Sequence, residues 1–245
     1  MDIAFYLYKK GRRVFLLQSG ENTSESFMTL LNDCVAEMKK QLDDIIIILC
    51  CGNLKKEQYR ALKYAGADRY ILKFETSDPG LYSAVKPSDS LEKRLKCIRD
   101  LIAAGYETGS GNIVGLPGQT QEVLLGDLDL VEKLDLTMAS SSVFISGEES
   151  AYRSEKNGDI DITLNFMALM RIMKPGLMIP STSSLERVCE GGQYRGLTAG
   201  ANTVTIHDGT PEHVKKYFPI YSTDRFTPNE DHIFSITKKA GLNIV

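Results

Sequence analysis

The chain has no long hydrophobic run and no excess of charge of either sign, and we expect no secretion leader. Its longest aliphatic run, residues 45–51, is far too short to cross a bilayer. No basic stretch followed by an apolar stretch opens the chain. With 29 Lys and Arg against 32 Asp and Glu, the net charge is −3, which favours neither nucleic acid nor a membrane surface as a partner. We therefore expect neither partner, and a cytoplasmic location.

Cysteine and histidine are also scarce. The five cysteines are an odd, sparse set in which Cys50 and Cys51 are adjacent, and this is typical of reduced cytoplasmic thiols rather than of a disulfide framework. Of the three histidines, His207 is followed by Asp208. Two ligands do not make a catalytic metal centre, which needs about three protein ligands, so we expect no such metal site.

What is present is an ordinary globular composition, with 42% apolar and 25% charged residues, in which short apolar runs alternate with amphipathic stretches. The predicted strands are residues 14–18, 45–51, 69–74, 109–114, 138–145, 177–180 and 202–207. The predicted helices between and after them are residues 24–41, 55–65, 90–104, 121–133, 162–174 and 185–199. This alternation predicts βαβ units and a parallel sheet in an α/β fold.

The number of units points to an incomplete parallel (β/α) TIM-type barrel. A complete barrel has eight strand–helix units, and this chain supplies about seven. Residues 2–10 predict a helix where a barrel would have its first strand. We expect one barrel domain over residues 1–245, whose first strand and following loop are absent. The open edge that remains would invite pairing with a second copy of the chain.

Polar and glycine-rich segments follow most of the predicted strands, where parallel barrels place their chemistry. Together with other short segments they resemble the radical S-adenosylmethionine (radical SAM) superfamily, in particular its biotin-synthase-like branch and the maturases of [FeFe]-hydrogenase. The matching segments are residues 17–21, 65–70, 74–76, 94, 105–109, 114–120, 179–182 and 199–202. The segment at 109–120, which ends Gly-Leu-Pro-Gly-Gln-Thr, is the most specific of them.

The resemblance implies a barrel that binds SAM, cleaves it reductively to a 5′-deoxyadenosyl radical and acts on a small molecule. The SAM-binding residues that it implies are Gln18, Ser19, Glu21, Glu75, Arg94, Ile113 and Gly115. It also implies a substrate cavity that includes Thr182, Ser183 and Tyr221. Glu21 would face the amino group of SAM, Glu75 its ribose, and Arg94 its carboxylate.

Each of these residues also has a structural interpretation. Glu21 is placed to cap the helix that begins near Ser24, and Glu75 and Arg94 are able to form a salt bridge between barrel and helix. Lys73 shares a strand face with Glu75. A strand-borne lysine can form a Schiff base, but here it stands where the maturases usually have arginine, and we favour that simpler interpretation.

The defining motif of the superfamily is missing from this sequence. Its members hold a [4Fe-4S] cluster with three cysteines spaced C-x₃-C-x₂-C, because such clusters need thiolates. The cysteines stand at 34, 50, 51, 97 and 189, so we expect this chain to bind no cluster. It would bind SAM weakly, have no catalytic residue of its own, and be truncated or inactive alone. Two alternatives remain: a non-enzymatic module for SAM-derived or metal-complex ligands, and a phosphate-handling barrel enzyme that uses residues 115–120.

Overall fold

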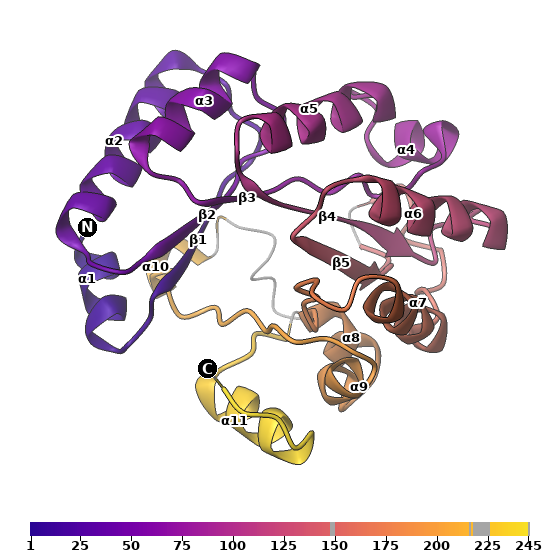
Figure 1. Ribbon diagram of the computed structural model, residues 1–245. Helices are drawn as coiled ribbons and strands as arrows, with labels where there is room; N and C mark the ends of the chain where they lie inside the picture. Colours follow the sequence, from indigo (N-terminus) through magenta and orange to yellow (C-terminus); the bar gives the residue numbers. More distant parts are fainter. Residues whose placement is uncertain (148–149, 216, 218–225, 245) are drawn as a thin grey trace.

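The computed structural model describes residues 1–147, 150–215, 217 and 226–244. Within them, a sheet of five parallel strands has the order β1-β2-β3-β4-β5 (Figure 1). The strands are β1 (Val14–Gln18), β2 (Ile46–Cys50), β3 (Arg69–Ile71), β4 (Glu107–Val114) and β5 (Met138–Val143). Strands that follow one another in the chain are neighbours in the sheet, as the predicted barrel topology requires.

The sixth and seventh predicted strands extend this sheet only as isolated bridges. Met178 pairs with Met138 of β5, and Pro180 pairs with Thr203. Pro180 has no N–H group to donate to a ladder. The sheet order therefore continues past β5 and confirms an incomplete (β/α) barrel, but the expectation of full strands at 177–180 and 202–207 was wrong.

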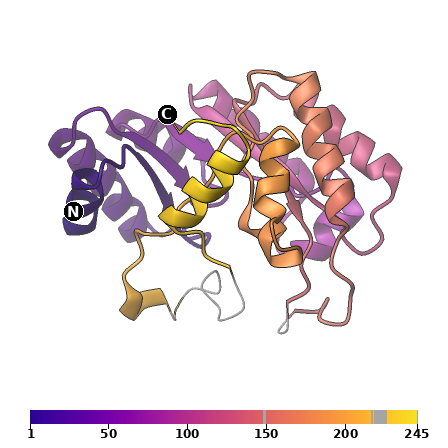
Figure 2. The same ribbon diagram turned by 90° about the horizontal axis from the view of Figure 1, so that it is seen from below.

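Helices cover the outer side of the sheet from α2 to α7, and α8, α9 and α11 follow beyond β5 (Figures 1 and 2). Their bounds are α1 (Asp2–Lys9), α2 (Glu25–Gln41), α3 (Lys56–Ala65), α4 (Pro79–Val85), α5 (Leu91–Ala103), α6 (Gln121–Lys133), α7 (Ile160–Met173), α8 (Ser183–Val188), α9 (Gly192–Thr198), α10 (Glu212–Lys215) and α11 (Glu230–Lys239). The side-chain oxygens of Ser24 and Thr120 cap α2 and α6, as their positions before apolar runs predict.

Helices α4 and α10 were not predicted, and one predicted helix is divided in two. Helix α4 was not predicted, although Asp78 caps it through the Leu81 N–H and Pro79 occupies its first turn, which is a recognised start signal. The single helix predicted at 185–199 is divided into α8 and α9, because Gly191 adopts φ 74° before α9. Cys189, at the end of α8, is extended, and the left-handed Gly191 then precedes the first turn of α9.

The two ends of the curved sheet are linked by charge. Arg12, in the turn between α1 and β1, pairs with Asp208 at 2.9 Å and with Glu230 at 3.3 Å. Both carboxylates lie far along the chain, beyond the last bridge of the sheet. This ion-pair cluster therefore links the segment before β1 to segments that follow the last bridge of the sheet.

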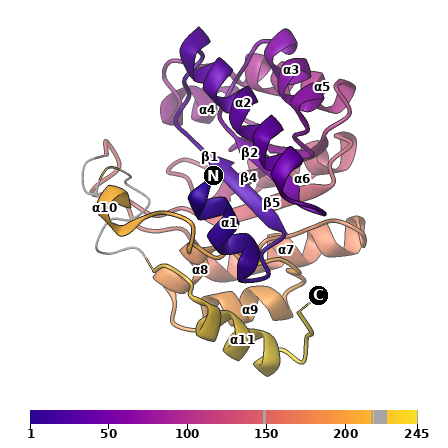
Figure 3. The same ribbon diagram turned by 90° about the vertical axis from the view of Figure 1, so that its left-hand side faces the viewer.

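The β1 edge is open and partly apolar. Phe15 is buried, whereas Val14 and Leu16, on the opposite strand face, are 51% and 36% exposed. Among the described residues, β1 pairs with β2 alone. Figure 3 looks onto this edge, with α1 beside it. An unpaired edge that carries apolar side chains is a template for pairing with another chain.

We expect the purified chain to self-associate through this edge. Sedimentation velocity over a wide concentration range should show a dimer that Leu16→Lys disrupts, because an inward-pointing charge on an edge strand opposes pairing. Leu125→Lys is the control, since Leu125 is 65% exposed on α6, which packs on β4 rather than on β1. A monomer at every concentration would contradict this expectation.

Candidate functional site

The carboxyl ends of β1 to β4 meet at one rim of the sheet, and the residues implied to bind SAM lie there. Ser19 follows β1 and donates its backbone N–H to the carbonyl of Cys50 on β2 at 3.1 Å. Glu75 follows β3, and its carbonyl accepts a hydrogen bond from Ile113 N on β4 at 2.8 Å. Parallel pairing therefore brings together residues that are distant in sequence.

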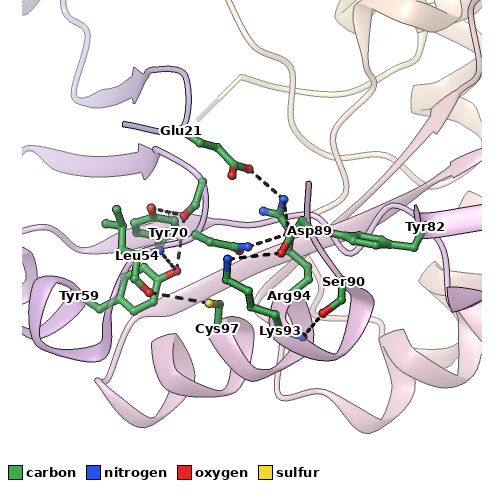
Figure 4. A network of polar contacts seen from close by, with 12 residues as sticks. Glu21, Leu54, Tyr59, Tyr70, Tyr82, Asp89, Ser90, Lys93, Arg94 and Cys97 are labelled. Atoms are coloured by element: carbon green, nitrogen blue, oxygen red, sulfur yellow. Dashed lines mark hydrogen bonds and ion pairs between the residues drawn. The ribbon is translucent and has the colours of Figure 1, made fainter. Parts of the chain in front are cut away.

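Arg94 is the buried cation of this rim (Figure 4). It lies in α5 and is 3% exposed. Its Nε donates to the Tyr82 hydroxyl at 2.7 Å, and a terminal nitrogen donates to Glu21 Oε1 at 2.9 Å. The same nitrogen is 3.3 Å from Asp89 Oδ2. Burial opposes the charged form, but the hydrogen bonds with Tyr82 and Glu21 raise the pKa of Arg94 above its ordinary value.

Asp89 supplies the buried counter-charge. Its Oδ2 accepts hydrogen bonds from the Tyr82 hydroxyl and from Asn53 Nδ2, each at 2.7 Å. Burial alone would raise the pKa of this carboxyl, but the Tyr82 hydrogen bond and the charge of Arg94 hold it below its ordinary value. Asp89 is thus ionised at neutral pH and holds α4, α5 and the loop after β2 together.

Gly52 allows Glu21 to reach this network. Gly52 has φ +76°, and a Cβ built there would lie 2.2 Å from Glu21 Cγ. Its carbonyl accepts a hydrogen bond from the Tyr70 hydroxyl at 2.8 Å. The side chain of Glu21 therefore crosses the backbone of the next strand end, and 46% of it stays exposed. The role of Gly52 beside Glu21 was not predicted, although the Cys-Gly-Asn sequence after the second predicted strand could have indicated it.

Glu75 has an unusual backbone and a buried carboxylate oxygen that is ion-paired with Lys73. Its φ of 63° is in the left-handed region, which is uncommon for residues other than glycine. Lys73 Nζ lies 3.2 Å from Glu75 Oε2 and also donates to Ser142 Oγ at 3.4 Å. Oε2 of Glu75 is buried and accepts no hydrogen bond from the described residues. The side chains of Lys73 and Glu75 do meet, but both residues lie beyond β3 rather than on one strand face as predicted.

The glycine-rich loop after β4 is closed by its own glutamine. Gln119 Oε1 accepts the backbone N–H of Gly115 at 2.7 Å and that of Leu116 at 3.3 Å, while Gln119 Nε2 donates to the Ile113 carbonyl at 2.9 Å. Gly115 has φ +89°, and a Cβ there would lie 2.3 Å from Gly158 Cα. Glycine is therefore required at this position.

The remaining residues that the resemblance implies are less closely associated with the rim. Gln18 ends β1 and is exposed. Thr182 and Ser183 begin α8, where Thr182 Oγ1 and Ser184 Oγ lie 2.8 Å apart. Tyr221 lies outside the described residues. The rim formed by Glu21, Glu75 and residues 113–115 is thus the part of the predicted site that the structure brings together.

The five thiols do not fit an iron–sulfur cluster. Cys34 lies in α2, Cys97 in α5, and Cys189 just beyond α8. Burial raises the pKa of Cys50, at the end of β2, to about 11, whereas a cluster needs thiolates. The described residues contain no group of three or more His, Cys, Asp or Glu that would hold a metal ion. We derive no chemistry through a cluster on this chain.

Comparison with known proteins gives the family. The model of the radical SAM superfamily matches residues 1–131. The [FeFe] hydrogenase maturase subunit HydE of Thermotoga maritima is 36% identical over 211 residues, which are 86% of this chain and 60% of that protein. The chain therefore belongs to the radical SAM superfamily. It spans about three fifths of the length of this maturase.

A more distant relative in sequence and two solved structures with a similar fold are also found. A biotin synthase of Nitratiruptor sp. is 26% identical over 79% of this chain and 68% of that enzyme. Methylornithine synthase has the same fold, with a TM-score of 0.78 and 20% identity over all of this chain and 72% of that one. The maturase HydG of Carboxydothermus hydrogenoformans superposes with a TM-score of 0.73 and 20% identity, over 98% of this chain and 57% of that one.

Asp89→Asn should lower the free energy of unfolding by about 1.5–3 kcal/mol at pH 7, since it weakens hydrogen bonds to a charged group beside buried Arg94. A carboxyl whose pKa is depressed in the folded state stabilises the protein above its unfolded-state pKa, so this difference should shrink as the pH falls below about 4. Urea unfolding of both proteins from pH 7 to 3 measures it. Asp100→Asn is the control, because Asp100 pairs with Lys96, which is 70% exposed. Equal losses from the two variants would contradict the assignment.

Anaerobic reconstitution with iron and sulfide should give far less than one cluster per chain, because the five cysteines are dispersed over separate elements. Iron analysis and the EPR signal of the reduced sample measure this. Close to four irons per chain, with a matching signal, would show that the thiols can rearrange into a site.

Proposed function

We propose that this chain binds S-adenosylmethionine at the carboxyl ends of β1 to β4, as the SAM-binding part of a radical SAM enzyme related to the hydrogenase maturase and to biotin synthase. The observation that carries the proposal is the carboxylate of Glu75 just beyond β3: its Oε2 is buried and makes no hydrogen bond among the described residues, with the Lys73 ammonium 3.2 Å away as an ion-pair partner. A carboxylate accepts two hydroxyl hydrogens side by side, and the ribose of SAM offers such a pair.

The residues next to Glu75 are suited to contact the remaining part of the nucleoside of SAM, its adenine. Ile113 donates its N–H to the Glu75 carbonyl, so the apolar side chain of Ile113 and the bare backbone of Gly115 lie next to the expected ribose position. These residues would hold the adenine side. Lys73, which pairs with Glu75, orients the carboxylate.

At the other end of the rim, Glu21 offers a half-exposed carboxylate for the ammonium group of SAM. Arg94 is nearly inaccessible and donates to Tyr82 and Glu21. We therefore assign Arg94 the task of holding Glu21 in place, and its direct contact with the carboxylate of SAM stays a prediction. When bound, SAM supplies the radical chemistry of the family; the residues of this chain bind and orient it.

The phosphate-handling alternative is less well supported. Its phosphate would need free N–H groups in the loop at 115–120, yet those of Gly115 and Leu116 are already donated to Gln119. The Thr120 hydroxyl caps α6 by accepting from Val123 N. We propose that the loop serves as a wall rather than as an anion cradle.

We also propose a cytoplasmic location and a small-molecule substrate, with Thr182 and Ser183 at its cavity. All five cysteines lie among the described residues and are free thiols, which suits a reducing compartment. None of the described helices is long and apolar enough to cross a membrane.

Isothermal titration with S-adenosylhomocysteine, a stable analogue of SAM, tests the proposal. The native chain should bind with a Kd between about 1 μM and 1 mM, and Glu75→Gln should weaken binding by about tenfold or more, since a hydrogen bond to a charged group nets roughly 1.5–3 kcal/mol. Glu107→Gln is the matched control, because Glu107 pairs with Arg69 at the opposite end of the strands. Absence of heat at millimolar ligand, or equal binding by all three proteins, would refute a site at Glu75.

A further inference from the structure

A second buried carboxylate lies behind the rim. Asp127, in α6, is fully buried. Its Oδ1 accepts the backbone N–H of Ser77 at 2.5 Å, and its Oδ2 accepts Asn112 Nδ2 at 2.8 Å. No described residue forms an ion pair with it, and burial raises the pKa of Asp127. A buried carboxylate without a counter-ion is costly, so an apolar side chain would suit stability better.

The first carboxylate oxygen of Asp127, Oδ1, holds the segment that carries Glu75. Ser77 comes two residues after Glu75, and its hydroxyl donates to the Val123 carbonyl of α6 at 3.0 Å. A Cβ at Gly126 would lie 2.7 Å from Ser77 Oγ, so this glycine lets the segment sit against the helix. The backbone of residues 75–77, including the left-handed Glu75, is therefore held on α6.

The second carboxylate oxygen, Oδ2, contacts β4 and the glycine-rich loop that follows it. Gln119 Nε2 lies 3.5 Å from Asp127 Oδ2, and Asn112 stands next to Ile113 on β4. An ionised carboxylate only accepts hydrogen bonds. It therefore turns the NH₂ group of Gln119 toward itself, and the Gln119 oxygen is left to face the N–H groups of Gly115 and Leu116. Asp127 thereby sets the orientation of the amide that closes the loop.

We propose that Asp127 is the positioning residue of the SAM site. One oxygen of its carboxylate holds the segment of Glu75, the other holds residues 113–115, and the two segments thus keep a single arrangement. This inference rests on the proposed function, since it names the residue that shapes that site from behind. Asp127 touches no ligand itself. It acts through Ser77, Asn112 and Gln119.

The test compares Asp127→Asn with the native chain in two measurements. The variant replaces one carboxylate oxygen by an NH₂ group, which must face a donor. Without ligand, NMR hydrogen exchange at the amides of Ser77, Gly115 and Leu116 should quicken by about tenfold, the factor that corresponds to about 1.4 kcal/mol. With S-adenosylhomocysteine, affinity should fall by about tenfold or more. Asp129→Asn is the control on the same helix, because Asp129 pairs with exposed Lys133, and it should change neither measurement.

A milder variant and a rescue separate positioning from simple stability. Gln119→Met removes only the hydrogen bonds that the Gln119 amide makes to the loop and to Asp127. Exchange should therefore quicken at Gly115 and Leu116 but not at Ser77. Combining Asp127→Asn with Asn112→Asp restores one donor–acceptor pair between these positions and should recover much of the affinity. Unchanged exchange at all three amides, or quickened exchange with native affinity, overturns the proposal. If the native chain itself binds no ligand, the proposed function fails, and the exchange pattern still decides whether Asp127 orders the two segments.

Discussion

Strands that run in parallel bring all their carboxyl ends to one rim, and every feature of the candidate site depends on this constraint. The ladder between β3 and β4 places Glu75 against Ile113, and the ladder between β1 and β2 places Ser19 against Cys50. Neither pair is close in sequence. The helices outside the sheet then supply groups that hold these rim residues from behind, among them Arg94 on α5 and Asp127 on α6.

These two buried charges are stabilised in opposite ways. Arg94 has two carboxylates and a phenol around it, so its burial is compensated by charge. Asp127 is compensated only by neutral donors. A compensated charge contributes to stability when its partners are well placed, whereas an uncompensated one mainly imposes geometry on the dipoles around it. Arg94 holds α4, α5 and the loop after β1 together, whereas Asp127 orients the glycine-rich loop after β4.

Much of the fold follows from patterns that the sequence carries. Apolar runs, capping residues such as Ser24 and Thr120, and glycines after helices predict five strands and most helices correctly, because these signals are local. The bridges at Met178 and Pro180 were overestimated as full strands, since apolar character does not reveal how far a sheet continues. The residues at the rim were found by resemblance and by their position after strands. Gly52 and Asp127 were missed, because close approach and burial of a charge are set by tertiary contacts.

The ion pairs of Arg12 with Asp208 and Glu230 have a mechanical consequence. A closed ring of strands resists a change in its diameter, because opening it breaks a ladder of hydrogen bonds. Here the two ends of the curved sheet are linked by side chains that are 24%, 31% and 51% exposed, and exposed ion pairs contribute little free energy and weaken with salt. The link that Arg12 makes between the start of β1 and the segments after the last bridge should therefore weaken as the ionic strength of the solution rises.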